Sequence, residues 1–203
     1  MSVLPSSQSR ITDHNRSVFA YLFDREGMWV VCPQCRGPAQ IEAEYAKYSW
    51  DRELAVLTCR NCLYRSTSAE PPSPPPKRCN SCGMRVSIDD PIPPRRGMGM
   101  GPPNRRQGCG FCRRLQNGCD PYFGFPFFLS EQIRGEELWA VNLLHAVDMR
   151  RYLGATLRER NPYGLSLSAM ARLPAWTKTA LMRPKVVRAL DKMIKAAGRY
   201  GLT

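Results

Sequence analysis

Hydrophobic and polar positions follow two different periods along this chain. Before about residue 119 the apolar residues come in short runs or alternate with polar ones, as in residues 39–45, which is the pattern of half-buried β-strands. From Gly135 onward they recur every three to four residues, as in helices that bury one face. The pattern therefore predicts an α+β protein, in which two consecutive small β-units precede a small α-helical C-terminal domain.

The strands are expected where β-branched and aromatic residues gather between turn-forming residues. Glycine and proline punctuate these runs, as Gly37-Pro38 does before residues 39–45. The predicted strands cover residues 28–31, 39–45, 54–57 and 84–88. A short apolar run at residues 17–24 fits one or two helical turns.

The longest helix is predicted over residues 136–160. Glu136 and Glu137 favour a helix N-terminus through the dipole, and the Asn161-Pro162 pair ends it. His145 shares the apolar face, which consists of Leu138, Val141, Leu143, Leu144, His145, Val147, Met149, Tyr152, Leu153 and Leu157. Without a second ligand residue at helical spacing, His145 is predicted to be a core histidine.

Shorter helices are expected around residues 166–173 and 174–182. The last helix should begin with Pro184 in its first turn, where proline is well tolerated. Apolar residues recur on its inner side at helical spacing, from Val186 to Ala197, while lysines and arginines take the outer side. This region is therefore predicted to form a small helical bundle.

Eight of the nine cysteines come as four C-x-x-C pairs: Cys32/Cys35, Cys59/Cys62, Cys79/Cys82 and Cys109/Cys112. Such a pair is typical of a metal knuckle, a tight turn that brings two thiolates to one ion. Two pairs complete the closed tetrahedral sulfur shell of a structural zinc site. The four pairs therefore predict two zinc ions per chain, and each β-unit is interpreted as a zinc ribbon.

Sequential pairing joins the first two pairs across 23 residues and the last two across 26, and both gaps are long enough for a β-hairpin. A cross-braced arrangement, with the second pair joined to the third, has a gap of 16 residues that also fits. That gap contains the stiff sequence PPSPPP, which favours separation of the two ends over closure. Sequential pairing is favoured, and cross-bracing is the alternative.

Paired cysteines also occur in disulfides, redox dithiols and iron sites. Disulfides are disfavoured because residues 1–17 contain no apolar run that would serve as a secretory signal. A thioredoxin-like dithiol would need a βαβ context, whereas CPQC is flanked by predicted hairpin strands. Iron in a rubredoxin-like site uses the same spacing, so the spacing alone leaves the metal open between zinc and iron. Cys119 is predicted to be a plain core thiol.

Charge is distributed unevenly along the sequence, whose formal net charge is +13. Residues 1–76 are neutral, residues 77–114 carry +7 and residues 131–203 carry another +7. Polyanions would therefore be expected to dock on the second ribbon and the C-terminal region. No apolar stretch approaches the length of a membrane span, so a cytoplasmic protein without membrane contact is expected.

Nucleic acid is the predicted partner, and the candidate contacts lie in two places. Residues 89–108 are rich in proline, glycine and arginine, a composition that favours an exposed loop that orders on binding phosphates. The outer side of the last helix is the second place, although a charge run is usually a solvated face. The candidate contacts are Arg95, Arg96, Arg105, Arg106, Arg113, Arg114, Lys185, Arg188, Lys192 and Lys195.

Residues 119–129 hold five aromatic side chains and almost no charge, so they are predicted to be buried. The alternative is that exposed aromatic rings beside arginines stack on bases. The predicted division of the chain is an N-terminal segment (residues 1–27), a first ribbon (28–66), a proline-rich linker (67–76), a second ribbon (77–119), and the aromatic segment with the helical domain (120–203).

A family resemblance is carried by the knuckles CPQC and CRNC followed by DPYFGFPFFL, GEELWAVNLLHAVDMRRYLGATLRER and RLPAWTKTALMRPKVVRAL. The knuckles alone are generic, and the helical string is more specific. Together these strings resemble a family of poorly characterised bacterial zinc-ribbon proteins, often described as having a ribbon of the transcription-initiation-factor-B type. The resemblance covers residues 28–197. It implies zinc ribbons and a helical C-terminal part, and the family's description favours nucleic acid by analogy alone.

Two classes of function follow from these observations. The first is a nucleic-acid-binding protein, with transcriptional regulation as its candidate role. The alternative is a protein-protein adaptor or accessory subunit that docks through the neutral first ribbon and the aromatic segment. An enzyme is not expected. Closed sulfur sites offer no open coordination position, and the sequence has no H-E-x-x-H motif or glycine-rich phosphate loop.

Overall fold

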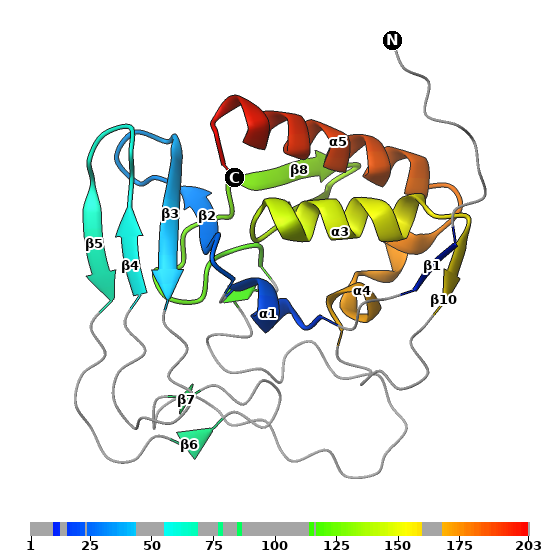
Figure 1. Cartoon of the computed structure of the whole chain (residues 1–203), viewed down its shortest axis with the longest axis horizontal. Coiled ribbons are helices and arrows are strands. Elements are labelled where there is room, and N and C mark those ends of the chain that lie inside the picture. The colour runs from blue at the N-terminus through cyan, green and yellow to red at the C-terminus, as the bar shows by residue number, and fades with distance from the viewer. Residues whose placement is uncertain are drawn as a thin grey trace. The chain divides into compact units, whose positions relative to one another are not determined.

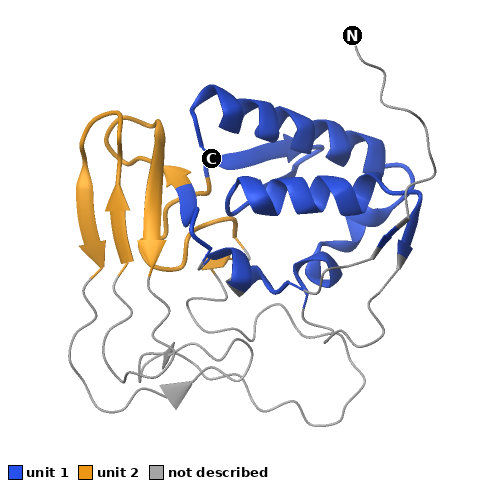
Figure 2. Ribbon diagram, viewed as in Figure 1, with its two compact units in different colours: residues 1–29, 128–203 blue, residues 30–127 orange. Residues whose placement is uncertain are grey.

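The structure is a computed structural model that describes residues 10–12, 16–22, 24–43, 55–68, 77–78, 85–86, 114–115, 117–159 and 168–202. The chain divides into two compact units, shown in Figure 2. One unit combines residues 1–29 with residues 128–203, and the other contains residues 30–127. The α+β class is confirmed, with an antiparallel four-stranded sheet, smaller strand pairs and helices near the C-terminus.

The four-stranded sheet has the order β2-β3-β4-β5 (Figure 1). Its strands are β2 (Met28–Val31), β3 (Pro38–Ala43), β4 (Ala55–Thr58) and β5 (Arg65–Ser68). In the antiparallel β3–β4 pair, Ile41 lies opposite Leu57, and both side chains are fully buried. Because successive side chains of a strand point to opposite faces, this register gives the sheet one apolar face.

Three of these strands coincide with predicted ones, but β5 was not predicted. Its sequence, RSTS, has no apolar residue, and every second position is exposed. The strand is held in the sheet by antiparallel pairing with β4 rather than by an apolar face. Ser68 Oγ also accepts a hydrogen bond from the Ala55 amide at 3.0 Å. The sheet therefore extends two residues into the segment predicted to be linker.

A second, very short antiparallel pair joins β6 (Lys77–Arg78) to β7 (Arg85–Val86). The strand β7 falls within the predicted strand at residues 84–88. The two strands lie on either side of the Cys79/Cys82 motif in the sequence. The two cysteines themselves lie outside the described residues.

The segment predicted to be buried is buried only in part. Phe127 is inaccessible to solvent, whereas Phe123 and Phe125 are half-buried and stack on each other, with their ring centroids 6.0 Å apart. The buried carboxylate of Asp120 accepts hydrogen bonds from the amides of Tyr122, Phe123 and Phe125, at 2.9, 2.7 and 2.6 Å. Burial raises the pKa of Asp120, while these amides act in the opposite direction. Cys119 is half-buried rather than fully within a core.

The predicted helix over residues 136–160 is wrong at its beginning. Residues there form β9 (Glu136–Ala140), which pairs antiparallel with β8 (Leu129–Ile133). The turn between them consists of Arg134 and Gly135, with φ of 54° and 83°. Two successive residues with positive φ are typical of the tight turn that matches the twist of a β-hairpin. Gly135 therefore closes a hairpin, and the dipole argument from the two glutamates does not apply.

The helix α3 (Leu143–Gly154) begins seven residues later, at an N-cap provided by Asn142. The side-chain oxygen of Asn142 accepts a hydrogen bond from the His145 amide at 2.9 Å. Its amide group donates to the carbonyl oxygens of Tyr21 and Gly27 at 2.9 and 3.1 Å. A buried side chain thus caps the helix and also ties it to the N-terminal segment.

The predicted helix is also too long at its end. After Gly154 the backbone becomes extended at Ala155, and β10 (Leu157–Glu159) pairs in parallel with β1 (Arg10–Thr12). Leu157 was placed on the apolar helix face, but its side chain is 52% exposed. Pairing with a strand nearly 150 residues away ends the helical pattern before the Asn161-Pro162 pair is reached. The C-terminal part is therefore mixed α and β rather than purely helical.

The remaining helices agree with the sequence pattern. They are α1 (Val18–Leu22), α4 (Ala169–Arg172), the 3-10 helix η1 (Ala175–Lys178) and α5 (Arg183–Arg199). Pro184 lies in the first turn of α5, as predicted. The helix α5 packs against α3 and β8 (Figure 1), and Val186, Leu190 and Met193 are buried there.

The prediction that His145 is a core histidine is confirmed. Its ring is stacked on Tyr21 with a centroid distance of 4.5 Å, and its Nδ1 accepts a hydrogen bond from the Val141 amide at 3.3 Å. Tyr21 in turn donates its hydroxyl to Asp148 at 2.9 Å. Burial lowers the pKa of His145 to about 3, because a charged imidazolium would have to give up its hydration.

This buried histidine should make the protein sensitive to acid. Between pH 3 and 6.5 the unfolded chain binds one more proton at His145 than the native chain, so the free energy of unfolding should rise with pH there. One proton corresponds to about 1.4 kcal/mol per pH unit. Urea unfolding of the full chain followed by circular dichroism at 222 nm, at several pH values, measures this slope.

The substitution His145→Gln should remove the slope that this side chain contributes, and above about pH 6.5 the histidine contribution should be flat. His14 is the only other histidine in the sequence, so His14→Gln is the matched control. Equal pH dependence in the parent and in His145→Gln would show that this ring does not cause the acid sensitivity.

Candidate metal centre

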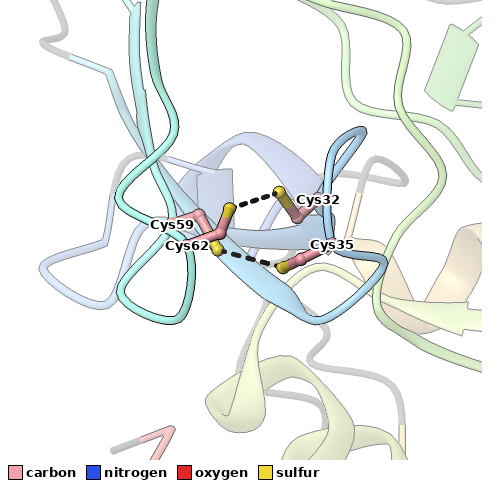
Figure 3. A group of neighbouring side chains, drawn as sticks. All are labelled: Cys32, Cys35, Cys59 and Cys62. Carbon is pink, nitrogen blue, oxygen red and sulfur yellow. Dashed lines mark hydrogen bonds between the residues drawn. The ribbon is translucent and has the colours of Figure 1, made fainter.

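Four cysteines converge at one end of the four-stranded sheet, as Figure 3 shows. Cys32 directly follows β2 and Cys59 directly follows β4, the two strands on either side of β3, so one sheet positions the first cysteine of each pair. Cys35 and Cys62 complete the two turns. All four sulfur atoms lie within 4.8 Å of one another. The structure therefore brings together the first two pairs, as sequential pairing predicts for the first site.

The sulfur positions fit a tetrahedral metal site. Cys32 Sγ lies 3.6 Å from Cys62 Sγ, and Cys35 Sγ lies 3.6 Å from Cys59 Sγ. Four sulfurs held about 2.3 Å from a zinc ion would be about 3.8 Å apart. A disulfide would instead need about 2.05 Å between the two sulfurs. The donor set and the spacing are thus compatible with one metal ion at this site.

Backbone hydrogen bonds fold each turn into a knuckle. In the first, the Cys32 amide donates to the Gly37 carbonyl at 2.8 Å and the Arg36 amide donates to the Cys32 carbonyl at 3.0 Å. In the second, the Cys59 amide donates to the Tyr64 carbonyl at 2.8 Å. These bonds close both turns within the backbone, so the cysteine side chains are positioned together by the sheet and its local turns.

The two knuckles also share an unusual backbone conformation. The residue after the second cysteine, Arg36 in one and Leu63 in the other, has φ of 64° and 60°. Glycine and asparagine adopt this left-handed conformation most readily. The sequence pattern offered no sign of it, because neither position holds such a residue.

The cysteines differ in their surroundings. Cys32 and Cys59 are buried, whereas Cys35 and Cys62 are half-buried. The pKa of Cys35 is lowered to about 6, chiefly because the Asn61 side-chain amide donates to its sulfur at 3.5 Å and the Gly37 amide assists. The pKa of Cys62 is raised to about 12; the Tyr64 amide lowers it, but burial and the neighbouring sulfurs outweigh this.

This contrast has a simple electrostatic cause. One thiolate is stabilised by the donors around it, but each additional negative charge must form beside the first one. A divalent cation removes that conflict, since it is a large positive charge at the centre of the cluster and deprotonates coordinating thiols. The cluster is therefore chemically suited to hold a cation through four thiolates.

The other predicted metal ligands, Cys79, Cys82, Cys109 and Cys112, lie outside the described residues. The same holds for the predicted phosphate contacts Arg95, Arg96, Arg105, Arg106 and Arg113. Arg114 is described, and its Nη1 donates to the carbonyl oxygens of Pro121 and Tyr122 at 2.8 and 3.0 Å. This guanidinium group is engaged in holding the aromatic segment, a role that the charge pattern alone did not indicate.

The four predicted contacts on the last helix share one face of α5. Lys185, Arg188, Lys192 and Lys195 are three or four residues apart, and Arg199 continues the series. We call these five residues the α5 stripe. Lys192 Nζ lies 3.6 Å from a Glu131 oxygen, and Asp191, the one acid within the helix, pairs with Arg150 at 2.9 Å. Among the described residues, no carboxylate forms an ion pair with the other four cations of the stripe.

The fold and the site together define an α+β protein with a four-cysteine cluster that is able to hold one metal ion. Comparison of the chain with family models, with curated proteins and with solved structures finds no match. The resemblance to bacterial zinc-ribbon proteins therefore stays a prediction. In the part of the chain that the structure describes, no helix has the length and apolar character to cross a membrane.

Proposed function

We propose that this is a non-enzymatic zinc protein that binds nucleic acid, chiefly through phosphate contacts. The observation that carries the proposal is the α5 stripe, five cations on one face of a 17-residue helix. From Lys185 to Arg199 the stripe is about 21 Å long at 1.5 Å per residue. The opposite face of α5 packs against α3 and β8, which orients the cations away from the core.

An ordered row of cations suits a polyanion better than a small anion. Each phosphate neutralised by lysine or arginine releases condensed counterions, so several contacts add to the affinity. The arginine-rich residues 89–108 would contribute further contacts at Arg95, Arg96, Arg105 and Arg106, with Arg113 nearby. These contacts position the protein on the backbone and do not by themselves read a base sequence.

Zinc has a structural role in this proposal. The four thiolates of Cys32, Cys35, Cys59 and Cys62 would fill its tetrahedral shell and leave no position for substrate or water. A second ion would be held by Cys79, Cys82, Cys109 and Cys112, as the repeated C-x-x-C spacing suggests. Both ions would stabilise small units that have too little apolar surface to fold by themselves.

The test is a salt titration of the zinc-loaded full chain with fluorescent duplex DNA, duplex RNA and single strands. The logarithm of the affinity should fall linearly with the logarithm of the salt concentration, by about 0.9 per phosphate contact on duplex DNA and about 0.7 on single strands. The α5 stripe alone would contribute up to about 4.5 to that slope on duplex DNA. Absence of binding at low salt, or affinity independent of salt, would reject the proposal.

A further inference from the structure

The tip of the second knuckle exposes an apolar side chain. Leu63 directly follows Cys62 and is 84% exposed, more than any other large apolar residue that the structure describes. Its backbone also has a φ of 60°. A bulky residue is disfavoured in this left-handed conformation relative to an ordinary backbone conformation. Two independent unfavourable features therefore coincide at one residue.

The knuckle fold itself requires the conformation but not the leucine. Arg36, at the equivalent position of the first knuckle, adopts the same conformation with φ of 64°. Glycine would satisfy the turn without strain and without exposed apolar surface. The leucine side chain therefore contributes nothing evident to the fold, and an outlier of this kind points to a role outside it.

Leu63 is surrounded in sequence and in the paired knuckle by positive charge. Arg60 and Arg65 flank it, Arg36 follows the first knuckle, and all three are exposed. The Asn61 amide reaches Cys35 Sγ at 3.5 Å, which places the tips of the two knuckles against each other. The one acidic residue in the described parts of residues 30–68 is Glu42, four positions along β3 from the knuckle end.

The arginines do not act as donors to the metal site. Apart from the cysteines themselves, Asn61 is the described side chain that donates a hydrogen bond to a cysteine sulfur of the cluster, while Arg60 donates to Gln40 at 3.4 Å. No carboxylate in the described residues forms an ion pair with Arg36, Arg60 or Arg65. The tip therefore combines an exposed apolar side chain with three cations whose charge is not neutralised by a carboxylate.

We infer that this tip, formed by Arg36, Arg60, Leu63 and Arg65, docks an acidic protein segment. The chemistry that fits it is a bulky apolar side chain of the partner, packed on Leu63, with aspartate or glutamate residues around it. Unstacked bases would be recognised by flat aromatic or guanidinium groups. The guanidinium groups of this tip could contact phosphates or bases as well as carboxylates, but the exposed Leu63 side chain between them suits an apolar side chain better than a phosphate backbone, which favours a protein partner at this tip.

The experiment selects peptides from a displayed library of random dodecamers against the immobilised, zinc-loaded full chain. Enriched peptides are synthesised, and their dissociation constants are measured by fluorescence anisotropy. We expect them to combine acidic residues with one bulky apolar residue. Absence of enrichment, or enriched peptides without acidic residues, would overturn the inference.

The decisive variant is Leu63→Asn, because asparagine tolerates the left-handed conformation and removes only the apolar surface. It should weaken peptide binding about 10-fold or more, since it removes most of the apolar area that the peptide buries. The matched control is Leu181→Asn, the same change at a leucine that is 70% exposed in the other unit. The control should bind as the parent does.

Zinc content of both variants is measured by elemental analysis, so that loss of the fold is distinguished from loss of docking. Equal peptide binding by Leu63→Asn and the parent would overturn the inference. So would a Leu63→Asn variant that loses DNA or RNA binding, because the tip would then belong to a nucleic-acid interface. Neither result affects the α5 stripe, whose own variants test it separately.

Discussion

Removal of the proposed zinc ion from the four-cysteine cluster is expected to unfold the β2–β5 sheet while the helices α3 and α5 stay folded. The sheet has one apolar face and its knuckles converge on the cluster, whereas α3 and α5 bury apolar side chains against each other. For zinc-finger peptides, metal binding supplies about 10–16 kcal/mol of apparent folding free energy. We expect chelation to change the strand signal of the full chain while the helical signal at 222 nm persists.

Cysteine substitutions separate the two proposed sites. Elemental analysis of the dialysed parent should find about two zinc ions per chain, the number that four C-x-x-C pairs can hold. The double substitution Cys32→Ser with Cys59→Ser should lower that number by one, because it removes one buried ligand from each knuckle. Cys119→Ser is the matched control and should leave the metal content unchanged.

The outcomes distinguish the proposed sites from each other. One ion in the parent, lost in the Cys32/Cys59 variant, would retain the described site and reject the second one. Iron instead of zinc would change the metal but not the ligands. A parent that keeps no metal after dialysis, or a sheet that is unaffected by chelation, would reject the metal centre.

Neutralising the α5 stripe should produce the second large effect. The variant combines Lys185→Gln, Arg188→Gln and Lys195→Gln, three positions without ion pairs among the described residues. Glutamine is a good helix former, so α5 should be retained. If all three residues contact phosphates, the salt slope on duplex DNA should flatten by about 2.7, and the affinity at 0.1 M salt should fall about 10²–10³-fold.

A matched control removes the same net charge elsewhere in the same unit. Arg134, Arg151 and Arg172 are exposed and lie outside α5, so their triple substitution by glutamine lowers the charge equally. It should leave most of the affinity in place. Equal losses in both triple variants would mean that net charge rather than the α5 stripe governs binding, and parental binding by the stripe variant would remove α5 from the interface.

Local patterns in the sequence were sufficient to predict the first cysteine site, β3 and α5. The spacing of Cys32, Cys35, Cys59 and Cys62 indicated a shared site, because a knuckle is formed by residues close in sequence and two knuckles can be joined by one hairpin. Residues 39–45 alternated clearly enough to predict β3, and the amphipathic period with Pro184 predicted α5. In each case the signal and the structure depend on neighbours within a few residues.

Where another strand pairs with a segment, the tertiary structure determined the secondary structure of that segment. Residues 136–140 have helical spacing, but hairpin pairing with β8 through the Arg134-Gly135 turn makes them a strand. Residues 157–159 leave the predicted helix because β1 supplies a parallel partner. Likewise β5, whose RSTS sequence has no apolar alternation, exists because β4 presents an edge to pair with.

Within the site, the sequence determined which residue types are present, while the fold determined their roles. The C-x-x-C pairs identified the thiols, but the 3.6 Å sulfur distances and the Asn61 contact depend on the sheet that brings both knuckles together. In the sequence Arg114 is one of several positive charges, whereas in the fold its guanidinium group donates hydrogen bonds to two carbonyl groups. Leu63 belonged to an unremarkable string, and only its exposure and left-handed backbone set it apart, because both properties depend on the surrounding turn.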